Sequence, residues 1–357
     1  MNRFSAILSV LIAILSFVPV ASWAGEVTSD VNKTTWQDIF SDVVGKYPIP
    51  QADDMSGDTA KKTGRLNIPK NWEFTFGTQR FVASHTSYEF GTDLPPFTKP
   101  LSRLEFPINT WWLNFDLRRT CPRWSVGARA GLSVNRNSNN WMKDSDWGNS
   151  GGENYLTNYS QSYCDVREAY QFSGDVDVNV SDWLRLPANL EIRPLFTFRY
   201  QHFSLMAHDG VQWNYDAGNS ESMPGNAISF RQDWWLYMIG ARGSYSIDIN
   251  RNLTVKLKGE ADWGPALGYN IDHHIQREGK RLTLENTMGN ALYFMTGLDM
   301  VIAKTVTIGV GVDYTWISTT GTHWFYNAPE GTDLRWTDGV KVWSDQLALI
   351  ARVSYAF

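Results

Sequence analysis

Apolar and polar residues alternate along most of the chain after about residue 70, as in strands whose two faces meet different surroundings. Trp111, Leu113 and Phe115 share one face of such a segment, and Asn114 and Asp116 share the other. We find about ten segments of this kind, at 70–90, 107–119, 124–136, 165–181, 186–204, 229–247, 252–270, 287–302, 305–318 and 345–357. The pattern therefore predicts an all-β fold of ten antiparallel strands.

The last of these segments ends the chain on an aromatic residue. Leu347, Leu349, Val353, Tyr355 and Phe357 lie on one face of it, which resembles the closing strand of bacterial outer-membrane β-barrels. Aromatic residues make up 14% of the chain, yet no stretch after residue 24 approaches the ~20 consecutive apolar residues of a membrane helix. Apolar faces opposite charged ones match a lipid-facing wall around a polar lumen. We therefore predict a ten-stranded antiparallel transmembrane β-barrel of the outer-membrane type.

The links between the predicted strands alternate in length. Short links occur at 118–122, 179–182, 248–252 and 303–305. Long links occur at 91–106, 137–164, 205–228, 271–286 and 319–344. Because such barrels have short periplasmic turns and long extracellular loops, the long links are expected outside the cell. Several predicted strands exceed the ~9–11 residues needed to cross a bilayer, so their outer ends are expected above the membrane.

The first part of the chain does not share the strand pattern. Residues 1–24 have a charged start, an apolar run and a small-residue cleavage site, which predicts a secretory signal peptide with Gly25 as the mature end. Residues 25–69 carry apolar residues at helical spacing before Pro48, followed by a polar stretch. We expect a short amphipathic helix on a flexible periplasmic extension, followed by the barrel at 70–357.

Two cysteines are predicted to remain free thiols. Cys121 falls at a predicted periplasmic turn, and Cys164 falls above the outer ends of the strands. The bilayer core is about 30 Å thick, whereas a disulfide requires Cα atoms within about 7 Å. The predicted topology therefore excludes a bridge between them.

Two short clusters carry the candidate chemistry, each just past the end of an alternating segment. In a strand, Asp144 shares a face with Asp146, and Asp272 shares a face with His274. His273 points to the opposite face and is interpreted as a bystander. Paired groups of this kind activate a water molecule, which is the chemistry of a hydrolase.

The two clusters resemble those of the omptin family of outer-membrane endopeptidases. Gly77 in the first strand, Trp147 after the aspartate pair and Arg281 after the Asp-His pair add to the likeness, which extends from about residue 77 to residue 357. The resemblance implies a ten-stranded barrel with its catalytic set at the extracellular end. It also implies that Asp272 and His274 form the dyad and that Asp144 and Asp146 form the facing couple.

A mechanism follows from the residue types. His274, neutral near pH 7 and held in one tautomer by Asp272, takes a proton from a water that Asp146 also positions. The resulting hydroxide attacks a peptide carbonyl. Two carboxylates as close as Asp144 and Asp146 repel, so one of them is expected to have a raised pKa and to carry the proton needed later. The sequence leaves open which one.

The chain departs from the family at the substrate pocket. In omptins an acidic pair lines the pocket for the basic residue before the scissile bond, and by the resemblance these substrate-binding positions fall on His85 and Asn270. The altered residues argue against a preference for Arg or Lys.

A second departure concerns lipid. The family's lipopolysaccharide-binding positions fall on Tyr200, His202, Asp233 and Met288, which are mostly not the acidic and basic types expected. Lipopolysaccharide is therefore considered as an activator but not favoured, and no cofactor or metal is expected.

Other readings remain open. An omptin-like barrel without activity could serve as an adhesin, a receptor or a passive pore, and the four site residues could instead hold a metal ion for hydrolysis. A secreted soluble β-protein is a further alternative. The expected partners are an extracellular peptide or protein substrate and outer-membrane lipid, with the protein acting as a monomer. The formal net charge of −5 gives no indication of nucleic-acid binding.

The predicted lumen is rich in charged residues. They are Asp116, Arg129, Lys256, Lys258, Glu260 and Asp262. We interpret them as an internal network of ion pairs rather than an ion pathway, and we expect the narrow lumen to exclude solutes.

Overall fold

Antiparallel strands make up nearly all of the described chain. The computed structural model describes residues 71–91, 100–150, 153–277, 281–327 and 332–357. The signal peptide and the extension predicted before residue 70 lie outside these ranges, so both stay predictions. Within the described ranges, no helix has the length and apolar character needed to cross a bilayer.

Twelve strands are formed. They are β1 (Trp72–Gly91), β2 (Pro100–Pro107), β3 (Trp111–Thr120), β4 (Trp124–Ser133), β5 (Asn137–Ser150), β6 (Glu153–Val178), β7 (Leu190–Asn214), β8 (Asn219–Asn250), β9 (Leu253–His274), β10 (Arg281–Ile302), β11 (Val306–Asn327) and β12 (Thr332–Ala356).

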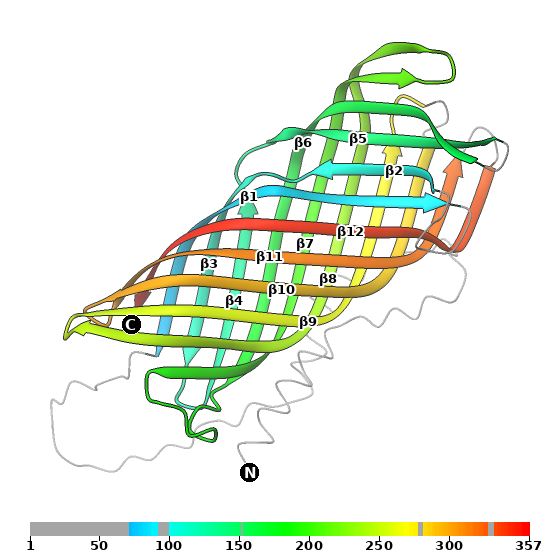
Figure 1. Ribbon diagram of the computed structural model, residues 1–357. Coiled ribbons are helices and arrows are strands. Elements are labelled where there is room, and N and C mark those ends of the chain that lie inside the picture. The colour runs from blue at the N-terminus through cyan, green and yellow to red at the C-terminus, as the bar shows by residue number, and fades with distance from the viewer. Residues whose placement is uncertain (1–70, 92–99, 151–152, 278–280, 328–331) are drawn as a thin grey trace, which may run out of the picture. The chain divides into compact units, whose positions relative to one another are not determined.

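The strands close into a ring, because β12 pairs with β1 (Figure 1, red beside blue). β1 pairs with β3 through residues 72–80 and with β2 through residues 85–91. β2 and β3 thus share one place in the ring at different levels. β4 and β5 share the next place in the same way, since β6 pairs with β4 through 170–178 and with β5 through 153–165. Each level of the ring therefore holds ten strands, and the predicted ten-stranded antiparallel barrel is confirmed, with its second and third strands each broken in two.

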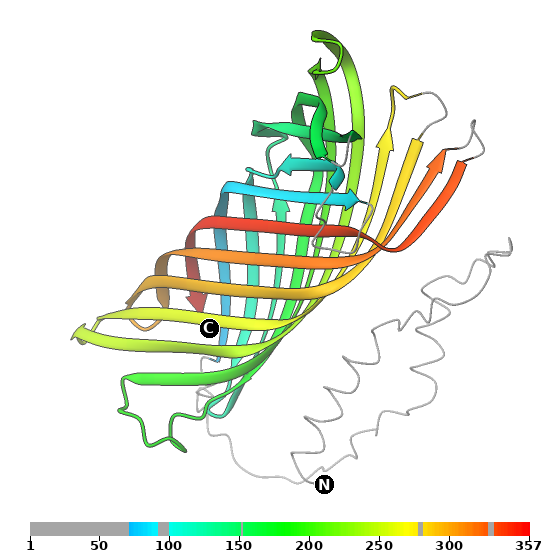
Figure 2. The same ribbon diagram turned by 45° about the vertical axis from the view of Figure 1, so that its right-hand side comes forward.

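The two ends of the barrel differ. One end, here called the base, carries Trp72, Phe357 and the links 121–123, 179–189, 251–252 and 303–305. The opposite end, here called the rim, carries the long strand extensions. Most of the long links predicted at this end are strands and not loops. Over 205–228, for example, β7 and β8 continue with only residues 215–218 between them. The β7–β8 hairpin projects beyond its neighbours at the top of Figure 2.

Alternation sorts the side chains between the wall and the lumen. Large apolar side chains such as Trp111, Phe115, Leu349 and Val353 are exposed on the outer face. Inward positions carry buried polar and charged groups instead. This is the reverse of a soluble core and matches a wall that faces lipid.

A cluster of charges lines the lumen at the base. The fully buried Asp177 carboxylate accepts hydrogen bonds from Ser125 (2.6 Å), Arg193 (2.7 Å), Arg242 (3.0 Å) and Arg118 (3.3 Å). These side chains line a cavity of about 290 Å³. One carboxylate thus holds three guanidinium groups, which come from three different strands.

The predicted ion-pair network extends toward the middle of the lumen. Arg129 lies 3.3 Å from Asp116, and Arg242 lies 2.9 Å from Glu260. Lys258 lies beside Asp299 as a further pair. Two predicted members are exceptions within the described residues: Lys256 forms no ion pair, and neither buried oxygen of Asp262 has a hydrogen-bond partner. The interpretation of the lumen charges as an internal network is confirmed for the paired residues and not for Lys256 and Asp262.

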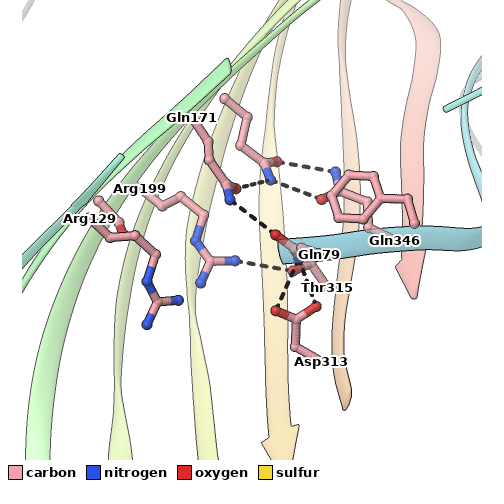
Figure 3. A pocket seen from close by; sticks show the side chains of 10 residues that line it. Gln79, Arg129, Gln171, Arg199, Asp313, Thr315 and Gln346 are labelled. Carbon is pink, nitrogen blue, oxygen red and sulfur yellow. Dashed lines mark hydrogen bonds between the residues drawn. The ribbon is translucent and has the colours of Figure 1, made fainter. Parts of the chain in front are cut away.

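Four glutamines cross the lumen above this network and are here called the amide belt (Figure 3). Gln346 and Gln201 exchange hydrogen bonds of 2.9 and 3.1 Å. Gln201 donates to Gln171 (3.4 Å), and Gln171 donates to Gln79 (3.5 Å), whose amide also donates to Asp313 (3.2 Å). The residues here leave a cavity of about 10 Å³, room for about one water molecule. The amide belt therefore closes the lumen between the rim and the base.

The two cysteines lie in different parts of the barrel. Cys121 lies in a base link, and Cys164 is buried in the rim half of β6. Both are free thiols, as predicted.

Candidate active site

The aspartate pair lies on β5, at the rim. β4 has 10 residues, which is enough to cross a bilayer, so β5 continues beyond the membrane-crossing part of the wall. Asp144 lies opposite Leu104 on β2, and Asp146 lies opposite Ser102. Leu104 and Met142 lie on the same face of the sheet as the two aspartates, and both are fully buried. Both carboxylates therefore face the lumen.

The Asp-His pair lies at the rim end of β9, on the strand's inward face. Asp272 is fully buried, and its Oδ2 lies 3.2 Å from Nε2 of His274. Asn270 also faces inward and is fully enclosed, whereas His273 occupies an outward position between Asp272 and His274. The i and i+2 spacing thus produces a contact between the carboxylate and the imidazole.

β5 and β9 lie on different sides of the ring, and the charges of Asp144 and His274 act on each other across the mouth. Burial and the repulsion of Asp146 raise the pKa of Asp144 to about 7, and His274 opposes this rise. Burial alone would lower the pKa of His274, but the attraction of Asp272, a hydrogen bond to it and the charge of Asp144 raise it above its usual 6.5. An imidazole and a carboxyl group whose pKa values are both raised therefore share one site.

Tyr88 joins the site from β1, and the sequence interpretation missed it. Its hydroxyl donates a hydrogen bond to Oδ2 of Asp272. Counted in steps of two from Gln79 and Phe81, which face the lumen, Tyr88 would face outward. A β-bulge at Ala83, whose φ is 49°, shifts the register and turns Tyr88 inward.

A row of buried polar side chains lies one level closer to the base than Asp272. Gln232, Asn270, Glu285 and His323 occupy neighbouring positions on β8, β9, β10 and β11. His323 Nδ1 lies 3.0 Å from Glu285 Oε1. In the described part of the chain, Nδ2 and Oδ1 of Asn270 and Nε2 of Gln232 have no hydrogen-bond partner. The floor beneath the dyad is therefore polar and carries one carboxylate beside one imidazole.

The metal-binding interpretation has no further structural support. Among the described residues, no group of three or more His, Cys, Asp or Glu side chains is arranged to hold a metal ion.

The sequence matches a family model over residues 99–325, which is most of the barrel. The chain belongs to the omptin family. No curated protein sequence matches it. Family membership supports an outer-membrane protease and gives the protein its location in the bacterial outer membrane.

A solved structure supports the fold of this omptin. The outer membrane protease OmpT from Escherichia coli is similar to it with a TM-score of 0.68 and 16% identity, over 81% of this chain and 98% of that one. The translocator domain of the autotransporter NalP from Neisseria meningitidis has a TM-score of 0.35 and 8% identity, over 80% of this chain and 88% of that one.

The structure does not bring the two predicted substrate-binding residues of this omptin together. His85 lies 3.5 Å from Asp345, which occupies an outward position on β12 next to the lumen-facing Gln346. Asn270 faces the lumen. The bulge at Ala83 shifts the register of β1, so His85 occupies an outward position, and its role in substrate binding stays a prediction.

The four positions that the resemblance linked to lipopolysaccharide fall on β7, β8 and β10. Tyr200 and His202 contact Oδ1 of Asp233 at 2.5 and 2.7 Å, and Arg231 contacts its other oxygen at 3.1 Å. Met288 is 67% exposed. The carboxylate is thus already enclosed by partners from the omptin's own wall, and the expectation of weak lipid activation stays a prediction.

Proposed function

We propose that this omptin is an endopeptidase that hydrolyses peptide bonds with a water molecule activated at the rim. Asp272 and His274 act as the dyad, and Asp144 and Asp146 act as the facing couple. The observation that carries the proposal is the 3.2 Å contact between Asp272 and His274 at the rim, and the effect of the Asp144 charge on the pKa of His274 supports it. Perturbed acid and base groups that converge in one mouth are typical of active sites.

The substrate is a peptide or protein outside the cell. The amide belt closes the lumen, so a polypeptide reaches the four groups only from the rim. All four side chains come from one chain, on β5 and β9. A monomer therefore suffices for the reaction.

His274 is the base that activates the water molecule. Its Nε2 faces Asp272, so Nε2–H donates to the carboxylate and Nδ1 accepts the proton of the water. Asp146 holds that water from the opposite side. The oxygen then bonds to the peptide carbonyl carbon, and the electron pair of the carbonyl moves to its oxygen.

Asp144 supplies the proton for the leaving group. With its pKa raised to about 7, it retains a proton near neutral pH. As the C–N bond breaks, this proton passes to the amine nitrogen. The proton held by His274 then passes to Asp144, which restores the resting state.

Asp144→Asn is expected to move the acid limb of the pH–rate profile to lower pH. Near its pKa of about 7, Asp144 is partly ionised, and this charge helps to raise the pKa of His274, so removing it lets His274 lose its proton at a lower pH. The alkaline limb near pH 7 should disappear, since the group responsible no longer titrates. Because the acid is also lost, kcat at the optimum should fall by about a hundredfold.

The measurement is kcat/KM across pH 5–9 for one cleaved peptide. Lys143→Gln is the matched control, since Lys143 is exposed on the outward face of the same strand. It should leave both limbs in place. An acid limb unchanged in Asp144→Asn would contradict the shared site.

The first test of the function is cleavage of a broad peptide library by the refolded protein in detergent, with and without added lipopolysaccharide and with and without a chelator. We expect cleavage that survives the chelator. Loss of cleavage with the chelator would favour metal-assisted hydrolysis. No cleavage by a protein whose gel mobility shows a folded barrel would overturn the proposal and favour an adhesin or receptor.

A further inference from the structure

The hydroxyl of Tyr88 contacts the dyad at the Asp272 carboxylate. It donates a hydrogen bond to Oδ2 of Asp272, the same oxygen that lies 3.2 Å from His274 Nε2. We propose that Tyr88 is a positioning residue of the reaction, which fixes the Asp272 carboxylate so that this one oxygen orients the imidazole. This inference rests on the proposed function.

Packing holds the Tyr88 ring in place. The ring is fully buried and stacks on Phe230, with centroids 5.8 Å apart and planes at 15°. Phe230 in turn stacks on Phe106, at 4.4 Å and 9°. Since Tyr88, Phe230 and Phe106 lie on β1, β8 and β2, three strands fix the direction of the hydroxyl. The contact therefore survives small movements of any single strand.

The hydroxyl remains a donor at every working pH. Burial and the nearby charge of Asp272 raise the pKa of Tyr88 well above its usual 10. Asp272 depends on this donor, because within the described residues its other oxygen is buried and has no hydrogen-bond partner. Tyr88 and His274 are thus the two side chains that contact the carboxylate in the part of the chain described here.

The titratable and charged groups around the dyad come from β1, β5, β9, the turn after β9, and β10. Asp272 and Asp144 raise the pKa of His274, and Arg277, in the turn after β9, lowers it. Glu285 and Tyr88 also face Asp272 from β10 and β1. Asp146 acts on Asp144, and Arg281 lies opposite His274 on β10. A general change of the surroundings would shift the pKa values of all of these groups. Loss of the Tyr88 hydroxyl instead removes one hydrogen bond, the one to Asp272.

Removing that hydroxyl has a defined electrostatic sign. With His274 neutral, the dyad carries one buried negative charge, and with His274 protonated, it carries no net charge. A hydrogen bond to the carboxylate stabilises the first state more than the second. Its loss therefore favours the protonated dyad and raises the pH at which His274 gives up its proton.

The test is Tyr88→Phe, which keeps the ring stack and removes only the hydroxyl. We expect the acid limb of the pH–rate profile to rise by about one pH unit. We also expect kcat at the optimum to fall about tenfold while KM stays within about twofold, because the buried hydroxyl does not reach the substrate. Tyr293→Phe is the matched control, since Tyr293 is a buried lumen-facing tyrosine whose ring lies under the Arg199 guanidinium. It should change neither quantity.

A readout that needs no activity separates this inference from the proposed function. The pKa of His274 is measured by NMR on histidine-labelled protein in detergent micelles, with His274→Gln used to assign its signal among the 6 histidines. A higher pKa of His274 in Tyr88→Phe supports the positioning role even if no peptide is cleaved. An unchanged pKa, or a change in KM alone, would overturn it.

Discussion

Alanine in place of His274 is expected to lower kcat/KM for peptide cleavage by at least about a hundredfold while the barrel stays folded. The imidazole is the base of the proposed reaction, and its Nδ1 accepts the proton of the attacking water. Asp272 cannot replace it, because that carboxylate is fully buried and accepts the hydrogen bond of Tyr88. Cleavage of one library-derived peptide at pH 7 is the measurement.

Two further variants make this result specific. His273→Ala removes the adjacent imidazole, which occupies an outward position on β9, and should keep full activity. Asp146→Ala should lose activity to a similar degree as His274→Ala, since both groups hold the same water. Full activity in His274→Ala would remove the dyad from the mechanism.

Asp177→Ala is expected to destabilise the barrel by about 3–5 kcal/mol. The carboxylate is fully buried and contacts the guanidinium groups of Arg118, Arg193 and Arg242, so its removal leaves buried positive charges without their shared partner. The measurement is the urea midpoint of unfolding, followed by tryptophan fluorescence and by heat-modified gel mobility.

The matched control for this change lies at the same end of the barrel. Asp182 is 80% exposed and lies 3.6 Å from Arg123, as an ordinary surface ion pair. Asp182→Ala should therefore change stability by less than about 1 kcal/mol. Equal effects of the two substitutions would mean that the base cluster does not stabilise the fold.

The number of strands was predictable from the sequence because contact with lipid requires an alternating apolar pattern within each strand. Every membrane-crossing strand needs apolar side chains on alternate residues, and β3 and β4 show this directly. The extensions at the rim were missed since both faces there meet water or other polar groups. β5 (Asn137–Ser150), for example, is polar on both faces over much of its length.

The candidate site was predictable where the alternation is unbroken. No register shift interrupts the pairing of β9 with β10, so Asp272 and His274 share a face as the spacing indicated. On β1, Ala83 adopts a positive φ with neither Gly nor Pro to signal it, and the register shifts. This one bulge explains why the alternation did not place His85 in an outward position or bring Tyr88 into the candidate site.

The pairing of residues from distant strands could not be inferred from the sequence. Glu285 contacts His323, and Asp177 contacts Arg118, only because the ring has closed with a particular register. The assignment of the proton to Asp144 rather than Asp146 likewise depends on burial, which the local sequence does not specify.

The amide belt has a consequence for the cell that carries this protein. Gln79, Gln171, Gln201 and Gln346 are hydrogen-bonded to one another across the lumen, and the cavity beside them has a volume of about 10 Å³. We therefore expect that a copy of this protein adds no open channel to the outer membrane. We expect that abundant expression would leave the permeability barrier to antibiotics and detergents intact, so that surface proteolysis is independent of leakage.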